Sequence, residues 1–407
     1  MWLWLTLGGS VASVVALLVV ASTVPLSSNI LRQRIVTTLS DRLESEVELQ
    51  GLQLRILPRF HVEGFGLSIR HRGRKDVPAL IKVDRLAVDA DLDSLLVKHV
   101  NAVTLTGLEI NIPPDHGHKD EDRAENSSRS SGLDAKNVSA REVVVDHLSA
   151  RDARLVIIPS ETDKPPKVWQ IHELAMQSVS FDRPMPFEAT LTNAIPPGEI
   201  HTKGSFGPWR SATPGATPLE GTFTFSDADL SVFKGISGIL SAHGKFGGSL
   251  GRIEVHGETT TPQFTVSVGG HPVLLHANYH ATVDGTNGDT LLDRIDASFL
   301  KTSLVAKGSV VATPGKNGRT VTLDVVMDKA RVEDALGLAL KAPKPPMTGA
   351  MKLRTKFLLP PGDRDVVEKL QLDGQFEIAT AKFTNIDIQK KVNELSHWSR
   401  GAAGDTD

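Results

Sequence analysis

Alternation of apolar and polar residues is the feature that most limits what this chain can fold into. In "MKLRTKF", from Met351, one set of alternate positions holds Met, Leu, Thr and Phe, and the other holds three basic residues. The same period of two recurs in "VTLDVVMD", from Val321, and in "LKTSLVAKGSV", from Leu300. Because successive side chains of a β-strand point to opposite faces, these runs predict strands with one apolar and one polar face. Turn signals such as "PGKNGR" and "PPGD" separate the runs, which favours an antiparallel sheet.

Helical patterns are short and few. The chain has 34 glycines and 23 prolines, a content that favours many short strands and turns over long helices. Helical spacing appears chiefly at 31–43, where leucine or isoleucine recurs every four residues, at 331–340 and at 387–398. We therefore expect a mostly β fold, built as a long twisted antiparallel sheet with few short helices.

Two irregularities stand out in this alternation. In "VELQGLQLRILP", from Val47, the apolar positions change from odd-numbered to even-numbered residues at Gly51, which predicts a bulge or turn there. Farther on, 100–114 and 145–160 share one order of features: an alternating run, a polar break, a second run and a proline stop. Such internal similarity is expected of a sheet that adds hairpins one after another.

The N-terminus predicts a membrane anchor. The first 31 residues contain no charged side chain, and the apolar run 2–24 is long enough to cross a hydrocarbon core of about 30 Å as a helix. A cleaved signal peptide, with "VVAS" at 19–22 as its cleavage site, is the alternative. The run lacks a basic leader and exceeds the usual signal length, so we predict a single transmembrane anchor over 1–26.

A polar stretch separates two parts of the remaining chain. Over residues 115–131 the only apolar side chain is Ala124, so this stretch cannot bury a core of its own. We predict a disordered linker over 115–140. It divides a helix-plus-β segment over 27–114 from a C-terminal β region over 141–407.

The histidine-rich stretch 271–290 invites a metal-site interpretation, which its spacing excludes. In "VLLHANYHATV", from Val273, His276 and His280 lie on the polar face of the predicted strand. Four residues along a strand span about 13 Å, far more than two bonds of about 2.1 Å to one ion can bridge. The loop "DGTNGD" has Thr and Gly where a calcium loop needs ligands. We expect a strand and a turn, with no metal.

No catalytic arrangement is found in the sequence. "GGSLG", around Ser249, fits a nucleophile motif, but "RIEVHGE" follows it and alternates like a strand where that motif needs a helix. The chain has no cysteine, so a thiolate nucleophile or ligand is excluded. We therefore expect a protein that is not an enzyme and needs no cofactor. The net charge of −3, without a basic stripe, excludes nucleic acid as a partner.

The apolar face of the sheet needs a cover that the few helices cannot supply. A second sheet would give a β-sandwich, whereas a sheet curled into a trough would be covered by lipid acyl chains. In the second case the alternating apolar residues of the C-terminal strands line an elongated groove. The residues expected to line it are Val273, Leu275, Ala277, Tyr279, Val283, Leu300, Leu304, Val310, Leu323, Val325, Leu353 and Phe357.

Several segments also resemble the AsmA-like family of bridge-like lipid transfer proteins. They include "RQRIVTTLSDRLESEVELQGLQLRILPRFHVEGFGLSI", from Arg32, "FSDADLSVFKGISGILSAHGKFGGSLGRIEVHGET", from Phe225, and "FTNIDIQKKVNELSHWSRGAAGD", from Phe383. The resemblance covers almost the whole chain and rests on glycine, proline and apolar positions spread along it. AsmA-like chains usually continue beyond the last segment with further strands. We therefore expect a short or truncated member, or a second chain that completes the groove.

The resemblance implies an inner-membrane anchor, a periplasmic body and a role in outer-membrane lipid homeostasis. Our leading hypothesis is a single-pass inner-membrane protein whose periplasmic body binds or transfers phospholipids or other acyl lipids. The alternative is an assembly factor with a β-sandwich body that influences outer-membrane protein assembly without binding lipid. Outer-membrane proteins are the partners that this alternative implies. The two hypotheses differ in whether the apolar strand faces pack against each other or stay open.

Overall fold

The chain forms two compact units, each of which is mostly β. The computed structural model describes residues 26–27, 32–33, 35–37, 40, 45–55, 60–71, 78–91, 99–112, 144–158, 166–180, 182–210, 213–267, 271–313, 318–362 and 364–384. The first unit comprises Met1–Ile195 and Glu199–Pro218, and the second comprises Pro196–Gly198 and Leu219–Asp407.

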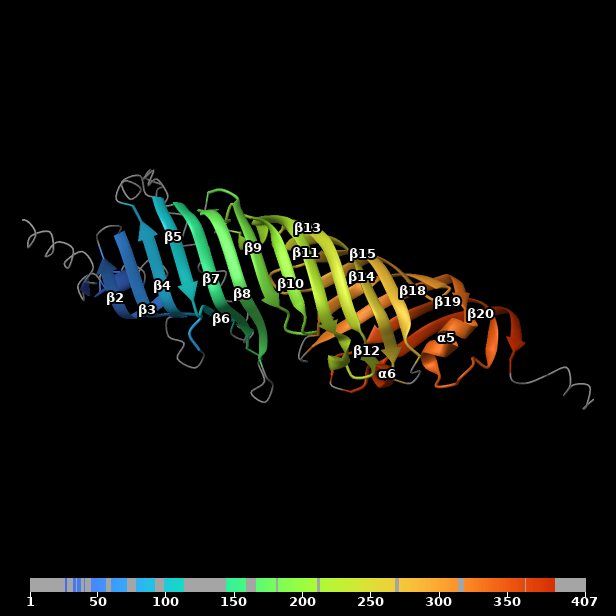
Figure 1. The fold of residues 1–407 in the computed structure, drawn as a ribbon. Helices are drawn as coiled ribbons and strands as arrows, with labels where there is room; N and C mark the ends of the chain where they lie inside the picture. The colour runs from blue at the N-terminus through green and yellow to red at the C-terminus, as the bar shows by residue number, and fades with distance from the viewer. Residues whose placement is uncertain are drawn as a thin grey trace, which may run out of the picture. The chain divides into compact units, whose positions relative to one another are not determined.

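The first unit contains strands β1 to β10 (Figure 1). Their bounds are β1 Leu26–Ser27, β2 Ser45–Arg55, β3 Phe60–His71, β4 Ile81–Ala90, β5 His99–Thr106, β6 Glu109–Ile112, β7 Val144–Ile157, β8 Lys167–Val179, β9 Met185–Thr192 and β10 Glu199–Phe206. Strands β2 to β5 pair antiparallel in chain order, and so do β7 to β10. The short β1 pairs with β2, and β6 pairs with β4.

The sheet of the first unit is mixed, so the prediction of a wholly antiparallel sheet is wrong here. Strands β5 and β6 both pair parallel with β7. The two stretches of similar sequence lie side by side, from Val100 opposite Val145 to Ile112 opposite Ile157. Parallel neighbours need a connection that returns the chain to the same end of the sheet, and residues 113–143 supply that length. The predicted linker lies outside the described residues, and the strands on either side of it belong to one unit.

The bulge or turn predicted at Gly51 is not found, because β2 runs unbroken and keeps one register with β3 on both sides of this glycine, although the buried positions do change parity there. Val47, Leu49 and Leu52 of β2 are all buried, although a strand without an irregularity would point Leu52 away from the other two. Gly66 of β3 faces this part of β2 and has a φ of +60°, which glycine adopts without strain. Leu49 and Leu52 are thus both buried without a shift of register between β2 and β3.

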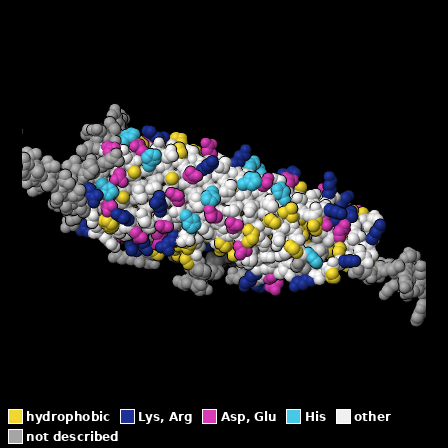
Figure 2. Space-filling model, in the orientation of Figure 1, with side chains coloured by type: hydrophobic (Ala, Val, Ile, Leu, Met, Phe, Trp, Pro, Cys, Tyr) yellow, Lys and Arg dark blue, Asp and Glu magenta, His cyan; other side chains and the backbone are white. Residues whose placement is uncertain are grey.

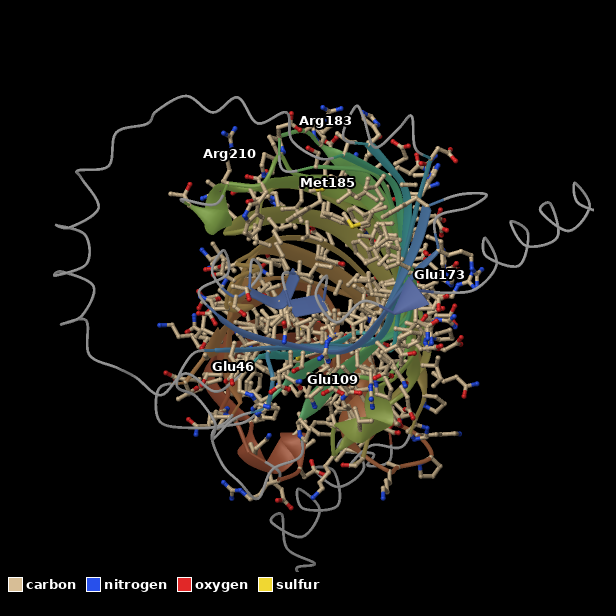
Figure 3. All side chains as sticks on the ribbon, turned by 90° about the vertical axis from the view of Figure 1, so that its left-hand side faces the viewer. Glu46, Glu109, Glu173, Arg183, Met185 and Arg210 are labelled. Carbon is tan, nitrogen blue, oxygen red and sulfur yellow. The ribbon has the colours of Figure 1, made fainter. Side chains whose placement is uncertain are left out.

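The apolar side chains of the first unit gather on the inner side of its curved sheet. Ala150 and Ala153 of β7 are 0% and 1% exposed. Figure 3 shows Glu173 and Arg183 on the outside of the sheet, whereas Met185 lies on the inner side and is only 6% exposed. The burial pattern of β8 alternates in the same way along the strand. The period of two read from the sequence thus sorts apolar and charged side chains onto opposite faces.

The second unit contains strands β11 to β20 and two short α-helices. Their bounds are β11 Pro218–Asp229, β12 Ile236–Ser237, β13 Ile239–Ser249, β14 Arg252–Val266, β15 Val273–Val283, β16 Thr290–Phe299, β17 Thr302–Ala312, β18 Arg319–Arg331, α5 Val332–Ala339, β19 Met347–Leu359, α6 Val366–Lys369 and β20 Gln371–Phe383. Strands β13 to β20 pair antiparallel in chain order. Helix α5 confirms the helix predicted over 331–340.

Helices α5 and α6 show that the sheet of the second unit curves. Helix α5 contacts β14 as well as β18 and β19, although three strands separate β14 from β18 in the sheet. Helix α6 lies beside β12 (Figure 1), and the Val366 amide at its start donates to the carbonyl of Lys234, 2.7 Å away. One face of the sheet is therefore concave, with both helices bridging from its last strands to its first.

Several predicted N- and C-terminal features fall outside the described residues. Among the residues described, no helix is long and apolar enough to cross a membrane. The predicted anchor lies outside the described residues, except for Leu26, which belongs to β1. The helix predicted over 387–398 also lies outside them. Part of the helix predicted at 31–43 is described: Arg32 lies in it, and its guanidinium donates to the carbonyls of Leu49 and Gln50.

Candidate functional site: the apolar face of the second unit

The pairing register of the second unit brings the predicted lining residues onto one face. Leu275 of β15 lies opposite Phe299 of β16. Ala277 lies opposite Ala297, which in turn lies opposite Leu304 of β17. Side chains directly opposite each other in an antiparallel pair point to the same side of the sheet. These rows therefore cross β15, β16 and β17 on one face.

The same face continues through β18 to β19. Val310 lies opposite Val321, and Leu323 lies opposite Phe357. The predicted residues that share this side, which we call the apolar face, are Val273, Leu275, Ala277, Tyr279, Val283, Leu304, Val310, Leu323, Val325, Leu353 and Phe357. That lipid covers this face stays a prediction.

Leu300 is the exception, and its placement on this face is wrong. It is the first residue of the two-residue turn between β16 and β17, because Phe299 pairs directly with Thr302. Its φ is +49°, and its side chain is 64% exposed. The alternation of "LKTSLVAKGSV" extends through Leu300 in the sequence, but the left-handed backbone of the turn ends the strand geometry on which that alternation depends.

The apolar face is only partly covered. Val273 and Val325 are 4% and 9% exposed, whereas Leu275, Leu304 and Phe357 are partly accessible. At the edge strand β20, the face ends in Leu372 and Phe376, which lie opposite Phe357 and Leu353 and are 62% and 68% exposed. In the sequence, Leu372 and Phe376 belong to the alternating run "LDGQFEI" at 372–378, which indicates that they share one face. The predicted lining did not include this run.

Small residues form much of the middle of the apolar face. The residues with small side chains in its rows include Ala242, Gly244, Gly248, Gly257, Ala277, Ala281, Ala297, Ala306 and Gly308. Larger side chains, such as Phe246 on β13 and Leu323 on β18, lie to either side of them. The Tyr279 side chain also lies on this face, and burial raises the pKa of its hydroxyl above the ordinary value. The face is therefore apolar and almost free of charge, and its alanines Ala242, Ala281 and Ala306 are buried beneath neighbouring side chains.

The opposite face of the second unit is polar and carries the histidines of the 271–290 stretch. Figure 2 shows Lys, Arg, Asp, Glu and His side chains spread over the visible surface of the molecule. His276 and His280 lie on this polar face, as predicted, and the part of the chain that the structure describes contains no cluster of three potential metal ligands. The stretch is a strand and a turn.

A cross-strand histidine pair on the polar face was not predicted. The rings of His280 and His256 stack with centroids 4.1 Å apart and an interplanar angle of 6°. Such stacked rings lie in parallel planes, so their nitrogens do not converge on one ion. Sequence spacing along β15 could not reveal the pair, because His256 belongs to β14 and meets His280 only through the register.

Two shallow hollows are lined mainly by polar and charged residues, together with a few residues of the apolar rows such as Leu304 and Met351. One, of about 350 Å³, is lined by His276, Asp296 and Ser303 among others. The other, of about 340 Å³, is lined by Lys301, Lys352 and Glu377 among others. Both include Asp328 and Lys329, next to the register shift between β18 and β19. Their mixed charges and low enclosure suit water better than a specific ligand.

A charged cluster on the outside of the first unit has shifted pKa values. His61 is hydrogen-bonded to Asp89, with Nδ1 2.6 Å from Oδ1, and to Glu63, with Nε2 3.0 Å from Oε1. The Asp89 and Glu63 carboxylates raise the pKa of His61 above its ordinary value of 6.5. The His61 ring, together with the Arg85 guanidinium, lowers the pKa of Glu63 below its ordinary value of 4.5.

We expect this cluster to stabilise the first unit most between pH 4.5 and 6.5. The contribution of His61, whose pKa is raised, is complete below 6.5 and is lost as the pH rises through its folded-state pKa. The contribution of Glu63, whose pKa is lowered, is complete above 4.5 and is lost as the pH falls through its folded-state pKa. Urea unfolding of wild type and His61→Gln across pH 4 to 9 should show the largest difference inside that window. A difference that does not vary with pH would contradict the assignment.

The comparisons with known proteins add no relative. A scan against protein-family models and a search of curated proteins each found no match to this chain.

Proposed function

We propose that this protein is a membrane-anchored, periplasmic lipid-binding or lipid-transfer protein that contributes to phospholipid transport and outer-membrane homeostasis. The observation that carries the proposal is the apolar face of the second unit. It runs unbroken across the strands from β13 to β20, and its edge leaves Leu372 and Phe376 more than half exposed.

The chemistry of this face suits an acyl chain. Exposed apolar patches larger than a few hundred Å² are rare on soluble monomers and mark binding surfaces. An acyl chain has no group that needs a hydrogen-bond partner, and its burial contributes about 0.8 kcal/mol for each methylene. Such a chain would lie against the side chains of the face that stay partly accessible, among them Leu275, Leu304 and Phe357.

The inner-membrane location and periplasmic body of this proposal come from the predicted anchor and the AsmA-like resemblance. The alternative, an assembly factor with a sandwich body, requires a second sheet that buries the same side chains. The partial exposure of Leu275, Leu304 and Phe357 favours the lipid-binding interpretation, because a packed sheet would leave these side chains buried.

A pair of adjacent substitutions on β17 tests the proposal. Leu304 lies on the apolar face, and its neighbour Val305, which is 39% exposed, lies on the polar face. In the full-length protein, Leu304→Asp should lower the phospholipid that co-purifies, measured by mass spectrometry per mole of protein, by at least about half. A charge in the path of an acyl chain costs a few kcal/mol. Val305→Asp should leave the lipid content unchanged.

Thermal melting separates the two hypotheses. On an open face, Leu304→Asp can be hydrated, so its melting temperature should stay close to that of Val305→Asp. In a sandwich, the same change would bury an unpaired charge and unfold the unit. Collapse of Leu304→Asp in a protein that never carried lipid would rule out the lipid-binding function.

A further inference from the structure

Strand β20 leaves a long sheet edge open. Among the described strands it pairs only with β19, and it runs for 13 residues from Gln371 to Phe383. Natural edge strands are usually protected from further pairing by proline, by an inward-pointing charge or by shortness. From Gln371 to Ala379, β20 has none of these: no proline occurs, and the inward positions are Leu372, Gly374, Phe376 and Ile378.

The edge of β2, in the first unit, is protected. The Ser40 hydroxyl accepts a hydrogen bond from the Val47 amide, and the Arg32 guanidinium donates to the carbonyls of Leu49 and Gln50. Strand β1 pairs with the end of the same edge. The chain thus caps one edge strand with its own side chains and leaves β20 open.

We propose that the edge of β20 from Gln371 to Ala379 is a strand-addition site. Its partner is an extended segment of another protein in which apolar residues alternate with lysine or arginine. Main-chain hydrogen bonds would supply affinity, and the alternating side chains would supply specificity. The inference rests on the sheet edge alone and stands whether or not the apolar face binds lipid.

The charge pattern of β20 selects a basic partner. The side chains of Asp373, Gln375 and Glu377 point to the polar face. On the paired side of the strand they already lie opposite Lys356, Arg354 and Lys352 of β19, in that order. A strand added to the free side with the same alternation would place basic residues beside Asp373 and Glu377, and apolar residues beside Leu372 and Phe376.

A second copy of this chain fits the edge poorly. Two β20 strands paired antiparallel about Gln375 would place Asp373 of each opposite Glu377 of the other, and like charges directly opposite are destabilising. Paired about Gly374, they would place Asp373 opposite the neutral Gln375 and gain no ion pair. Strand β2 of a second copy is capped, and its exposed Glu46 and Glu48 are also acidic. A basic strand of a different protein, which would pair with both Asp373 and Glu377, therefore fits the edge better than a second copy.

Fluorescence anisotropy with two synthetic peptides tests the proposal on the full-length chain. One peptide, MKLRTKFLL, has the sequence of residues 351–359, and the other, MELETEFLL, has glutamate in place of the three basic residues. We expect the basic peptide to bind at least about tenfold more tightly, because the two cross-strand charge pairs with Asp373 and Glu377 change sign. The double variant Asp373→Asn with Glu377→Gln should abolish that preference without placing like charges opposite Lys356 and Lys352 of β19, and its melting should show that it is folded.

A matched variant controls for general electrostatics. Glu254→Gln with Glu258→Gln makes the same change of charge on β14, an interior strand, and should leave the peptide preference unchanged. The proposal is overturned if neither peptide binds, or if the β20 variant keeps the wild-type preference. It is also overturned if only a chain ending at residue 384 binds, since residues 385–407 would then occupy the edge. Dimers of the chain that the peptide dissociates would overturn it as well.

Discussion

Replacing Asp334 with leucine should lower the free energy of unfolding of the second unit by about 3 kcal/mol. Asp334 lies in α5 and is 5% exposed. Its Oδ2 accepts hydrogen bonds from the Lys301 amide, 2.9 Å away, and from the Thr302 hydroxyl, 2.8 Å away. Leucine would remove the partner of both donors, and a buried unpaired donor such as the Thr302 hydroxyl, in a residue that is 2% exposed, costs about 1–3 kcal/mol.

Asparagine provides the matched control at this position. Both donors bind the same oxygen of Asp334, so the amide oxygen of Asp334→Asn can keep both contacts without the charge. Thermal melting followed by near-ultraviolet circular dichroism should show a loss of about 8 °C for Asp334→Leu and a small change for Asp334→Asn. Equal melting of all three proteins would mean that this carboxylate does not hold α5 to the turn between β16 and β17.

The fold of the second unit follows closely from its sequence, because the signals that specify it are local. A period of two decides which face each side chain takes, and short turns keep neighbouring strands in chain order. Leu275, Leu323 and Phe357 therefore share a face that could be predicted without knowing which residues lie opposite one another. The helix at 331–340 is likewise a local pattern, with Glu333 and Asp334 in its first turn.

Features that depend on distant pairing were not predictable. The parallel arrangement of β5 with β7 depends on the path of residues 113–143, which no alternation records. The stacked ring of His256, on a different strand from His280, becomes visible only through the register. The buried role of Asp334 was hidden for the same reason, because an acidic residue early in a helix resembles one placed there for the helix dipole.

Gly308→Ala should be about as damaging as Asp334→Leu, although it adds one methyl group. Gly308 lies on β17, opposite Leu323 of β18. An added Cβ would lie 1.9 Å from the carbonyl oxygen of Thr322 and 2.9 Å from the Cα of Leu323, and both are backbone atoms. No side-chain rotation can relieve such a contact, so β17 and β18 would have to separate locally. We expect a loss of about 3 kcal/mol, at the upper end of the usual cost of overpacking.

Gly337→Ala, in the same unit, supplies a control in which the added methyl group should not lower the free energy of unfolding. Gly337 lies in α5, and an added Cβ would have no atom within 4 Å. Alanine is a better helix former than glycine by about 1 kcal/mol, so this variant should be as stable as wild type or more stable. Urea unfolding of both variants measures the difference directly. If Gly308→Ala and Gly337→Ala unfolded at the same urea concentration, then β17 and β18 would not approach as closely as the register requires. The continuous apolar face across these two strands, on which the lipid-binding proposal depends, would then be in doubt.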